Sequence, residues 1–183
     1  MNFGPRIACL AVMLTTLATL TLLSPVSVQA QTTREEALAR LFPGARIEAE
    51  RVFLTEAQRQ RAEELSGVDV DSLLIARYVA TEGDRVVGLA YIDTHVVRTK
   101  NESLLIGLNP DRTVRRVEVT AFLEPTEYMA SEAWYAQYES RGLSDDLNLQ
   151  RAIRPIAGAS LTGRAATEAV RRALAIDQAI SED

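Results

Sequence analysis

Five segments of the chain have the pattern of β-strands, because they alternate between apolar and polar positions or are rich in apolar and β-branched residues. They are predicted over 45–54, 71–80, 85–97, 102–109 and 113–123. The turn residues Glu82-Gly83-Asp84 follow the second segment, and Pro110-Asp111 follow the fourth. Short turns of this kind join antiparallel strands, so the pattern predicts two hairpins.

Apolar residues at helical spacing predict helices before, between and after these strands. The predicted helices cover 33–42, 55–67 and 131–138, with a last one from Thr162 or Gly163 to about Ile176. Thr33, Thr55 and Ser131 stand where N-cap residues are expected. The segment 147–153 fits neither a helix nor a strand pattern.

The order of these elements predicts an α+β fold, because hairpin-linked strands make an antiparallel sheet and the helices are segregated from them. We expect a twisted antiparallel sheet of about four to five strands with helices packed on it. Residues 31–183 are expected to form a single domain. An alternative places 31–70 in a small helix–strand–helix subdomain.

Residues 1–30 have the layout of a secretory signal peptide. Arg6 precedes an apolar run over 7–23, and Val28-Gln29-Ala30 place small residues before a cut at Gln31. The mature protein is therefore expected in the periplasm or elsewhere outside the cytoplasmic membrane. The alternative is an uncleaved segment that anchors the chain in the inner membrane.

Composition excludes several kinds of chemistry. The only cysteine, Cys9, lies in the signal segment, so the mature chain has no disulfide partner and no ligands for iron–sulfur clusters or c-type haem. With His95 as the only histidine, the composition also argues against a zinc site of the His/Cys kind, and we expect no metal. The net charge is −5 and both signs are interleaved, which argues against nucleic acid as a partner.

The stretch IAGASLTGR, 156–164, can seat a phosphate. It places small residues and hydroxyls directly before a helix, where free backbone N–H groups and a partial positive charge attract anions. Arg164 in the first turn opposes the helix dipole unless an anion lies nearby. The alternative is plain packing of a loop into a helix with Thr162 as the cap.

Four segments in order carry a resemblance to a known family: VVGLAYIDTHVVRT (86–99), VEVTAFLEPTEY (117–128), SEAWYAQY (131–138) and GASLT (158–162). Over most of residues 40–176 the chain resembles the FMN-binding domain family, and it is most similar to the small exported members. The family also includes the C subunit of sodium-translocating NADH:quinone reductase and the G subunit of the Rnf complex. The resemblance implies that a flavin transferase joins the FMN phosphate to the last threonine of the motif, Thr162.

The resemblance also implies a set of cofactor-binding residues and no catalytic residue. The set is Gly158, Ala159, Ser160, Leu161, Thr162, His95, Arg98, Glu124 and Trp134. For Trp134, as for Tyr91, Phe122, Tyr128 and Tyr135, the alternative role is packing in the core. Two positions depart from the family motif, because Arg154 replaces its aspartate and Ala157 its serine.

These observations predict an exported electron carrier that holds FMN through Thr162 and exchanges electrons with a membrane-bound or periplasmic redox partner. Two alternatives stay open: an FMN held without a covalent bond, and a binding or scaffold module without a cofactor. A Ser/His/Asp hydrolase is disfavoured, because Ser160 does not lie in a Gly-x-Ser-x-Gly elbow.

Overall fold

An open antiparallel sheet of five strands forms the centre of the protein, with its strands in sequence order. The structure is a computed structural model that describes Met1 and residues 33–182, so the signal-peptide expectation concerns residues outside the described part. The strands are β1 (Arg46–Phe53), β2 (Leu74–Glu82), β3 (Arg85–Val96), β4 (Asn101–Leu108) and β5 (Val114–Phe122). The predicted α+β class is confirmed.

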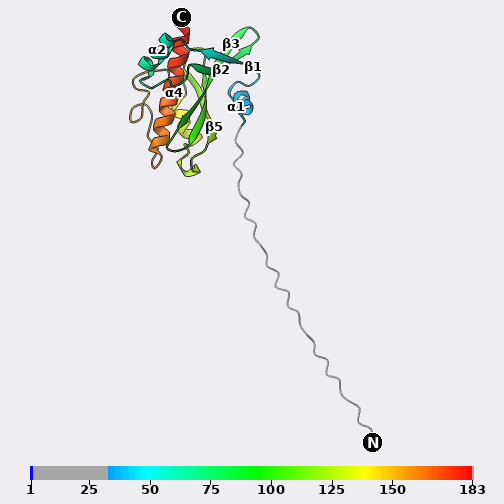
Figure 1. The fold of residues 1–183 in the computed structure, drawn as a ribbon. Helices are drawn as coiled ribbons and strands as arrows, with labels where there is room; N and C mark the ends of the chain where they lie inside the picture. The colour runs from blue at the N-terminus through cyan, green and yellow to red at the C-terminus, as the bar shows by residue number, and fades with distance from the viewer. Residues whose placement is uncertain (2–32, 183) are drawn as a thin grey trace. The chain divides into compact units, whose positions relative to one another are not determined.

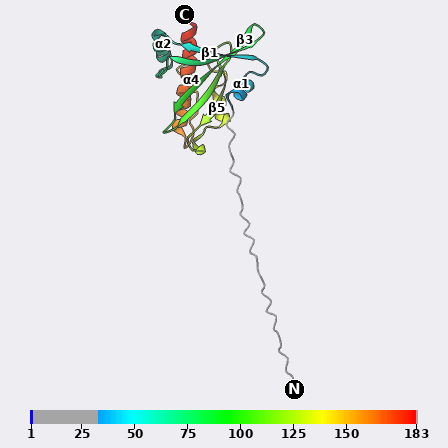
Figure 2. The ribbon, with the colours of Figure 1, turned by 45° about the vertical axis from the view of Figure 1, so that its right-hand side comes forward.

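The helices cover both faces of this sheet. Helix α4 (Ser160–Ser181) runs along one face, and α2 (Glu56–Ser66) lies beside its C-terminal part, as Figures 1 and 2 both show. Helix α1 (Arg34–Leu41) packs on the opposite face. Strand β4 is therefore buried on both sides, with Leu104 and Ile106 toward α4 and Leu105 toward α1.

Local capping explains where the first two helices begin. The side chains of Thr33 and Thr55 each accept a hydrogen bond from the main-chain N–H three residues later. The side chains of Glu36 and Gln58 in turn accept from the main-chain N–H groups of the two threonines. These reciprocal bonds satisfy N–H groups that a helix start leaves free. Gly67 ends α2 in the left-handed conformation that favours glycine.

The last helix is longer than expected at both ends. It begins at Ser160 rather than at Thr162 or Gly163, so Thr162 is not its cap. It continues to Ser181 because Ala179 is buried and because Arg61 of α2 binds Glu182 just beyond the end of the helix. Packing against α2 thus extends the helix past the end that periodicity suggested.

The remaining connections are short. The helix expected over 131–138 is divided into α3 (Glu132–Tyr135) and the 3-10 turn η2 (Ala136–Tyr138), and another 3-10 turn, η1 (Thr126–Tyr128), follows β5. The ambiguous segment 147–153 contains an isolated parallel bridge between Leu149 and Ile153.

The N-terminal part of the domain joins the common sheet. Strand β1 pairs with β2 over its whole length, from Arg46 opposite Thr81 to Phe53 opposite Leu74. Residues Gln31–Asp183 belong to one compact unit. In the part of the chain that the structure describes, no helix is long and apolar enough to span a membrane.

Candidate functional site

The start of α4 carries free main-chain donors. Its cap residue Ala159 has no side chain that could accept a hydrogen bond, and the preceding Gly158 has a φ of 80°. Within residues 33–182, no group accepts from the N–H groups of Ser160, Leu161 and Thr162. Helix starts of this kind present several N–H groups and a partial positive charge to an anion.

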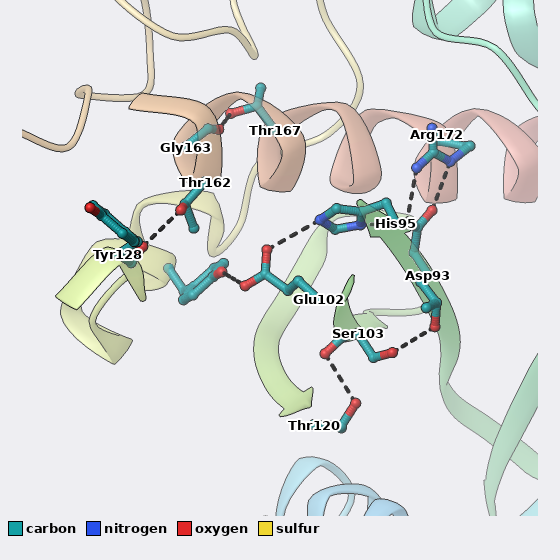
Figure 3. Close-up of polar contacts among 12 residues, drawn as sticks. Asp93, His95, Glu102, Ser103, Thr120, Tyr128, Thr162, Gly163, Thr167 and Arg172 are labelled. Carbon is teal, nitrogen blue, oxygen red and sulfur yellow. Dashed lines mark hydrogen bonds and ion pairs between the residues drawn. The ribbon is translucent and has the colours of Figure 1, made fainter. Parts of the chain in front are cut away.

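The side chain of Thr162 points inward. The residue is only 1% exposed, and its Oγ1 donates a hydrogen bond of 2.7 Å to the main-chain carbonyl of Tyr128 (Figure 3). Its neighbours Ser160 and Leu161 are exposed. The threonine hydroxyl therefore joins the first turn of α4 to the turn η1 that follows β5.

A small cavity of about 130 Å³ lies beside this turn. It is lined by the segment Gly158–Thr162 together with Val97, Arg98, Glu124 and Tyr128. The segment between β3 and β4, the end of β5 and the start of α4 thus converge on one point. Of the nine residues expected at a cofactor site, this cavity brings together all except His95 and Trp134.

Glu124 holds one wall of this cavity in place. Its Oε1 accepts hydrogen bonds from the main-chain N–H groups of Thr99, at 2.6 Å, and Lys100, at 2.8 Å, and a third from the Thr99 hydroxyl. These main-chain hydrogen bonds stabilise the carboxylate and lower the pKa of Glu124. Glu124 therefore fixes the segment that carries Arg98.

Trp134 lies outside the cavity and supports the loop that leads into α4. Its Nε1 donates a hydrogen bond of 2.7 Å to the carbonyl of Arg154, and its ring meets those of Tyr135 and Tyr138 edge to face. The main-chain N–H of Arg154 donates to Gln137. Tyr135 is itself buried in the core, as is Tyr91. Tyr91 and Tyr135 therefore have the alternative role of core residues, and Trp134 packs against the same core.

His95 lies in a partly buried line of polar groups rather than at the small cavity. Its Nδ1 is 2.9 Å from Asp93, and its Nε2 is 3.2 Å from Glu102, which has no exposure (Figure 3). Arg172 of α4 donates two hydrogen bonds to Asp93, at 2.7 and 2.9 Å. At the other end, Tyr135 donates to Glu102 at 2.7 Å.

The charges in this line favour a protonated imidazole. Burial lowers the pKa of His95, but the hydrogen bonds and charges of Asp93 and Glu102 outweigh it and raise the pKa to about 9. Arg172 and the His95 imidazolium then balance the two carboxylates. His95, Asp93 and Arg172 also line a separate cavity of about 490 Å³ between the sheet and α4.

Sequence reasoning missed most members of this line. The spacing of Asp93 and His95 places both on one face of a strand, but Arg172 lies 79 positions from Asp93 in the chain. Glu102 left a usable signal, because it is a charged residue at the start of an otherwise apolar strand. Among the described residues, no group of three or more His, Cys, Asp or Glu side chains could hold a metal ion.

Comparisons with protein-family models, with curated proteins and with solved structures gave no match to this chain.

Proposed function

We propose that this domain binds FMN with its phosphate at the start of α4 and carries electrons outside the cytoplasmic membrane. The observation that carries the proposal is the convergence of the free N–H groups of residues 160–162 with Arg98 on one small cavity. Free main-chain donors at a helix start and a guanidinium are the groups that bind phosphate.

The residues around the cavity fit the phosphate end of the cofactor. Ser160 adds an exposed hydroxyl, and Gly158 leaves the approach to the main chain open, since no atom lies within 4 Å of where a Cβ would stand. The negative charge of Glu124 does not compete for the donors at α4, because its Oε1 binds Thr99 and Lys100 instead. Arg98 is left to face an anion.

The size of the cavity indicates where the ring belongs. Pockets that enclose small molecules have volumes of about 300–1,000 Å³, whereas this one has about 130 Å³. It can hold a phosphate group but cannot enclose a three-ring flavin. The ring would therefore lie toward the surface, where another protein can approach it, and this suits a carrier with no substrate turnover of its own. When bound, FMN supplies one- or two-electron transfer.

Covalent attachment would use the Thr162 hydroxyl. The Oγ1 would form a bond to the flavin phosphorus of a flavin dinucleotide, and that phosphorus would lose its P–O bond to the nucleotide half. The hydroxyl proton and the nucleoside monophosphate would leave, so that the product is protein plus FMN less one water. The hydrogen bond from Oγ1 to Tyr128 must break first. The turn η1, which carries Tyr128, would then have to move away from Thr162 when the transferase binds.

The same geometry supports a second mode, in which FMN is held without a covalent bond. Thr162 is buried and its hydroxyl is already engaged, while Ser160 and the N–H groups of the first turn remain free for a phosphate. Arg154 also replaces the acid of the family motif. In this mode Arg98 and the start of α4 would hold the cofactor by charge and hydrogen bonds alone.

The deciding experiment is the intact mass of the exported protein after acid denaturation, from cells that contain a flavin transferase. A mass equal to residues 31–183 plus FMN less one water supports the covalent mode. Yellow protein with a bare polypeptide mass supports the non-covalent mode. Colourless protein with a bare mass contradicts FMN binding and favours the scaffold alternative.

A further inference from the structure

Exposed basic and apolar residues line the small cavity or belong to the segments that border it. We define the mouth surface as Arg98, Lys100, Leu123, Leu161 and Arg164. All five are exposed, and in the described part of the chain none of the three basic side chains makes an ion pair or a side-chain hydrogen bond. Free basic groups next to exposed leucines are typical of a contact surface for another molecule.

The members of the mouth surface come together through contacts that the structure fixes. Arg98 and Leu161 both line the cavity. Lys100 is held at the same wall, because its N–H binds Glu124, and the N–H of Leu123 donates to the Asn101 carbonyl. Arg164 follows Leu161 by one helical turn, which places both on the same side of α4.

The charge of this surface is opposite to that of the whole protein. The chain has a net charge of −5, yet the mouth surface as defined contains three bases and no acid. Of the nearest acids, Glu124 is buried and bound to the main chain, and Glu168, one turn beyond Arg164, is exposed and borders the larger cavity. A partner that approaches the mouth therefore meets a local positive potential.

We infer that the mouth surface is the docking site for a redox partner protein that presents acidic groups around an apolar centre. The inference rests on the proposed function, since a flavin ring that extends from the small cavity brings electron transfer to this surface. Arg98 lines the cavity and is assigned to the phosphate, so Lys100 and Arg164 are left to meet the partner. Complementary charge speeds the encounter, and the leucines provide apolar contact.

An anionic membrane is the less fitting occupant. Segments that bind anionic lipids carry clusters of about four to eight basic residues, whereas the mouth surface has three and Arg98 faces the cavity. The net negative charge of the domain also opposes approach to a negative bilayer. Binding to vesicles is therefore kept as an outcome of the test.

The test compares two forms of one electron acceptor, a lysine-rich c-type cytochrome and the same cytochrome with its lysines succinylated. The flavin-loaded protein is reduced, and its oxidation by each acceptor is followed by stopped flow between about 10 mM and 0.5 M salt. We expect the succinylated form to react about tenfold faster at low salt, with the difference vanishing at high salt. Faster reaction with the lysine-rich form would overturn the inference, because the net charge alone would then govern the encounter.

Charge-reversed variants assign the effect to the mouth surface. Lys100→Glu combined with Arg164→Glu should reverse the preference. Arg51→Glu is the matched control, because Arg51 is an exposed base without a partner on the edge strand β1. A control that reverses the preference as strongly as the mouth variants would contradict the assignment.

A flavin-free measurement separates this inference from the proposed function. Succinylated cytochrome is titrated into isotope-labelled apoprotein, and amide shifts are expected at 97–100, 123 and 161–164. Such shifts in a protein that never binds flavin would refute the proposed function and leave the docking site standing. Shifts elsewhere in a protein that does bind flavin would refute only the docking site. If the protein binds phosphatidylglycerol vesicles at about 0.15 M salt and the mouth variants do not, the partner is a membrane surface and the inferred protein partner is wrong.

Discussion

The hydroxyl of Thr162 donates a hydrogen bond of 2.7 Å to the carbonyl of Tyr128, which lies 34 positions earlier in the chain. This bond joins the first turn of α4 to the turn that follows β5, and both border the small cavity. One atom thus has two candidate roles, since Oγ1 supports the local structure and is also the atom to which a flavin phosphate would be joined. The two roles can be separated by substitution.

Thr162→Ala should abolish covalent flavin and lower the free energy of unfolding by about 1 kcal/mol, the net value of one hydrogen bond. Thr162→Ser is the control, because it keeps the hydroxyl, and it should keep most of the attachment and stability. Intact mass reports attachment and urea unfolding reports stability. Equal labelling of the alanine variant would show that Thr162 is not the attachment point.

Arg154→Asp should raise the fraction of protein with attached flavin, because it restores the acid of the family motif. The fold should tolerate the change, since only the main chain of Arg154 is engaged, with Trp134 and Gln137. Arg154→Ala serves as the control for removal of the positive charge alone. If mass spectrometry finds the same attached fraction in all three proteins, the transferase does not read this position.

The fold could be predicted from the sequence because its elements are marked locally. Threonine caps marked the starts of α1 and α2, and alternation marked the strands. The ends of α4 were not predictable in this way, because the contact of Arg61 with Glu182 depends on how two helices lie together. Packing between elements is not visible in a local pattern.

The candidate site was predictable in part for the same reason. The motif at 158–162 is contiguous, and the resemblance added Arg98 and Glu124, which the structure places beside it. The partly buried line of Asp93, His95, Glu102, Tyr135 and Arg172 was not predictable as a whole. Its members come from two strands, a short helix and α4, and only the register of these elements brings them together.

His95 should titrate far above an ordinary histidine. It is the only histidine of the chain, so its imidazole proton resonance can be followed by NMR without assignment, and we expect a pKa of about 9. This pKa exceeds the ordinary value of 6.5, so the stabilisation is complete below about pH 6.5 and is lost as pH rises through about 9. The loss between about pH 7 and pH 10 should be about 2.5 kcal/mol.

His95→Gln provides the control for this pH dependence. Glutamine retains hydrogen-bonding capacity but does not titrate, so urea unfolding of the variant should lose most of the pH dependence between about pH 7 and pH 10. The variant should also be less stable at neutral pH, because Asp93 and Glu102 lose the positive charge between them. A wild-type resonance that titrates near 6.5 would contradict the charged line inferred from the structure.

Gly88→Ala should destabilise the domain by about 1–3 kcal/mol, the usual cost of overpacking a core. A Cβ at Gly88 would overlap the ring of Phe42 at the end of α1 and would stand 2.6 Å from the main-chain oxygen of Leu108. The ring can turn away, but the main chain of β4 cannot, because both neighbouring strands hold it. Gly142→Ala is the matched control, since no atom lies within 4 Å of its Cβ position, and it should change stability by less than about 1 kcal/mol. Equal unfolding midpoints for the two variants in urea would contradict the close approach of the Leu108 main chain to Gly88.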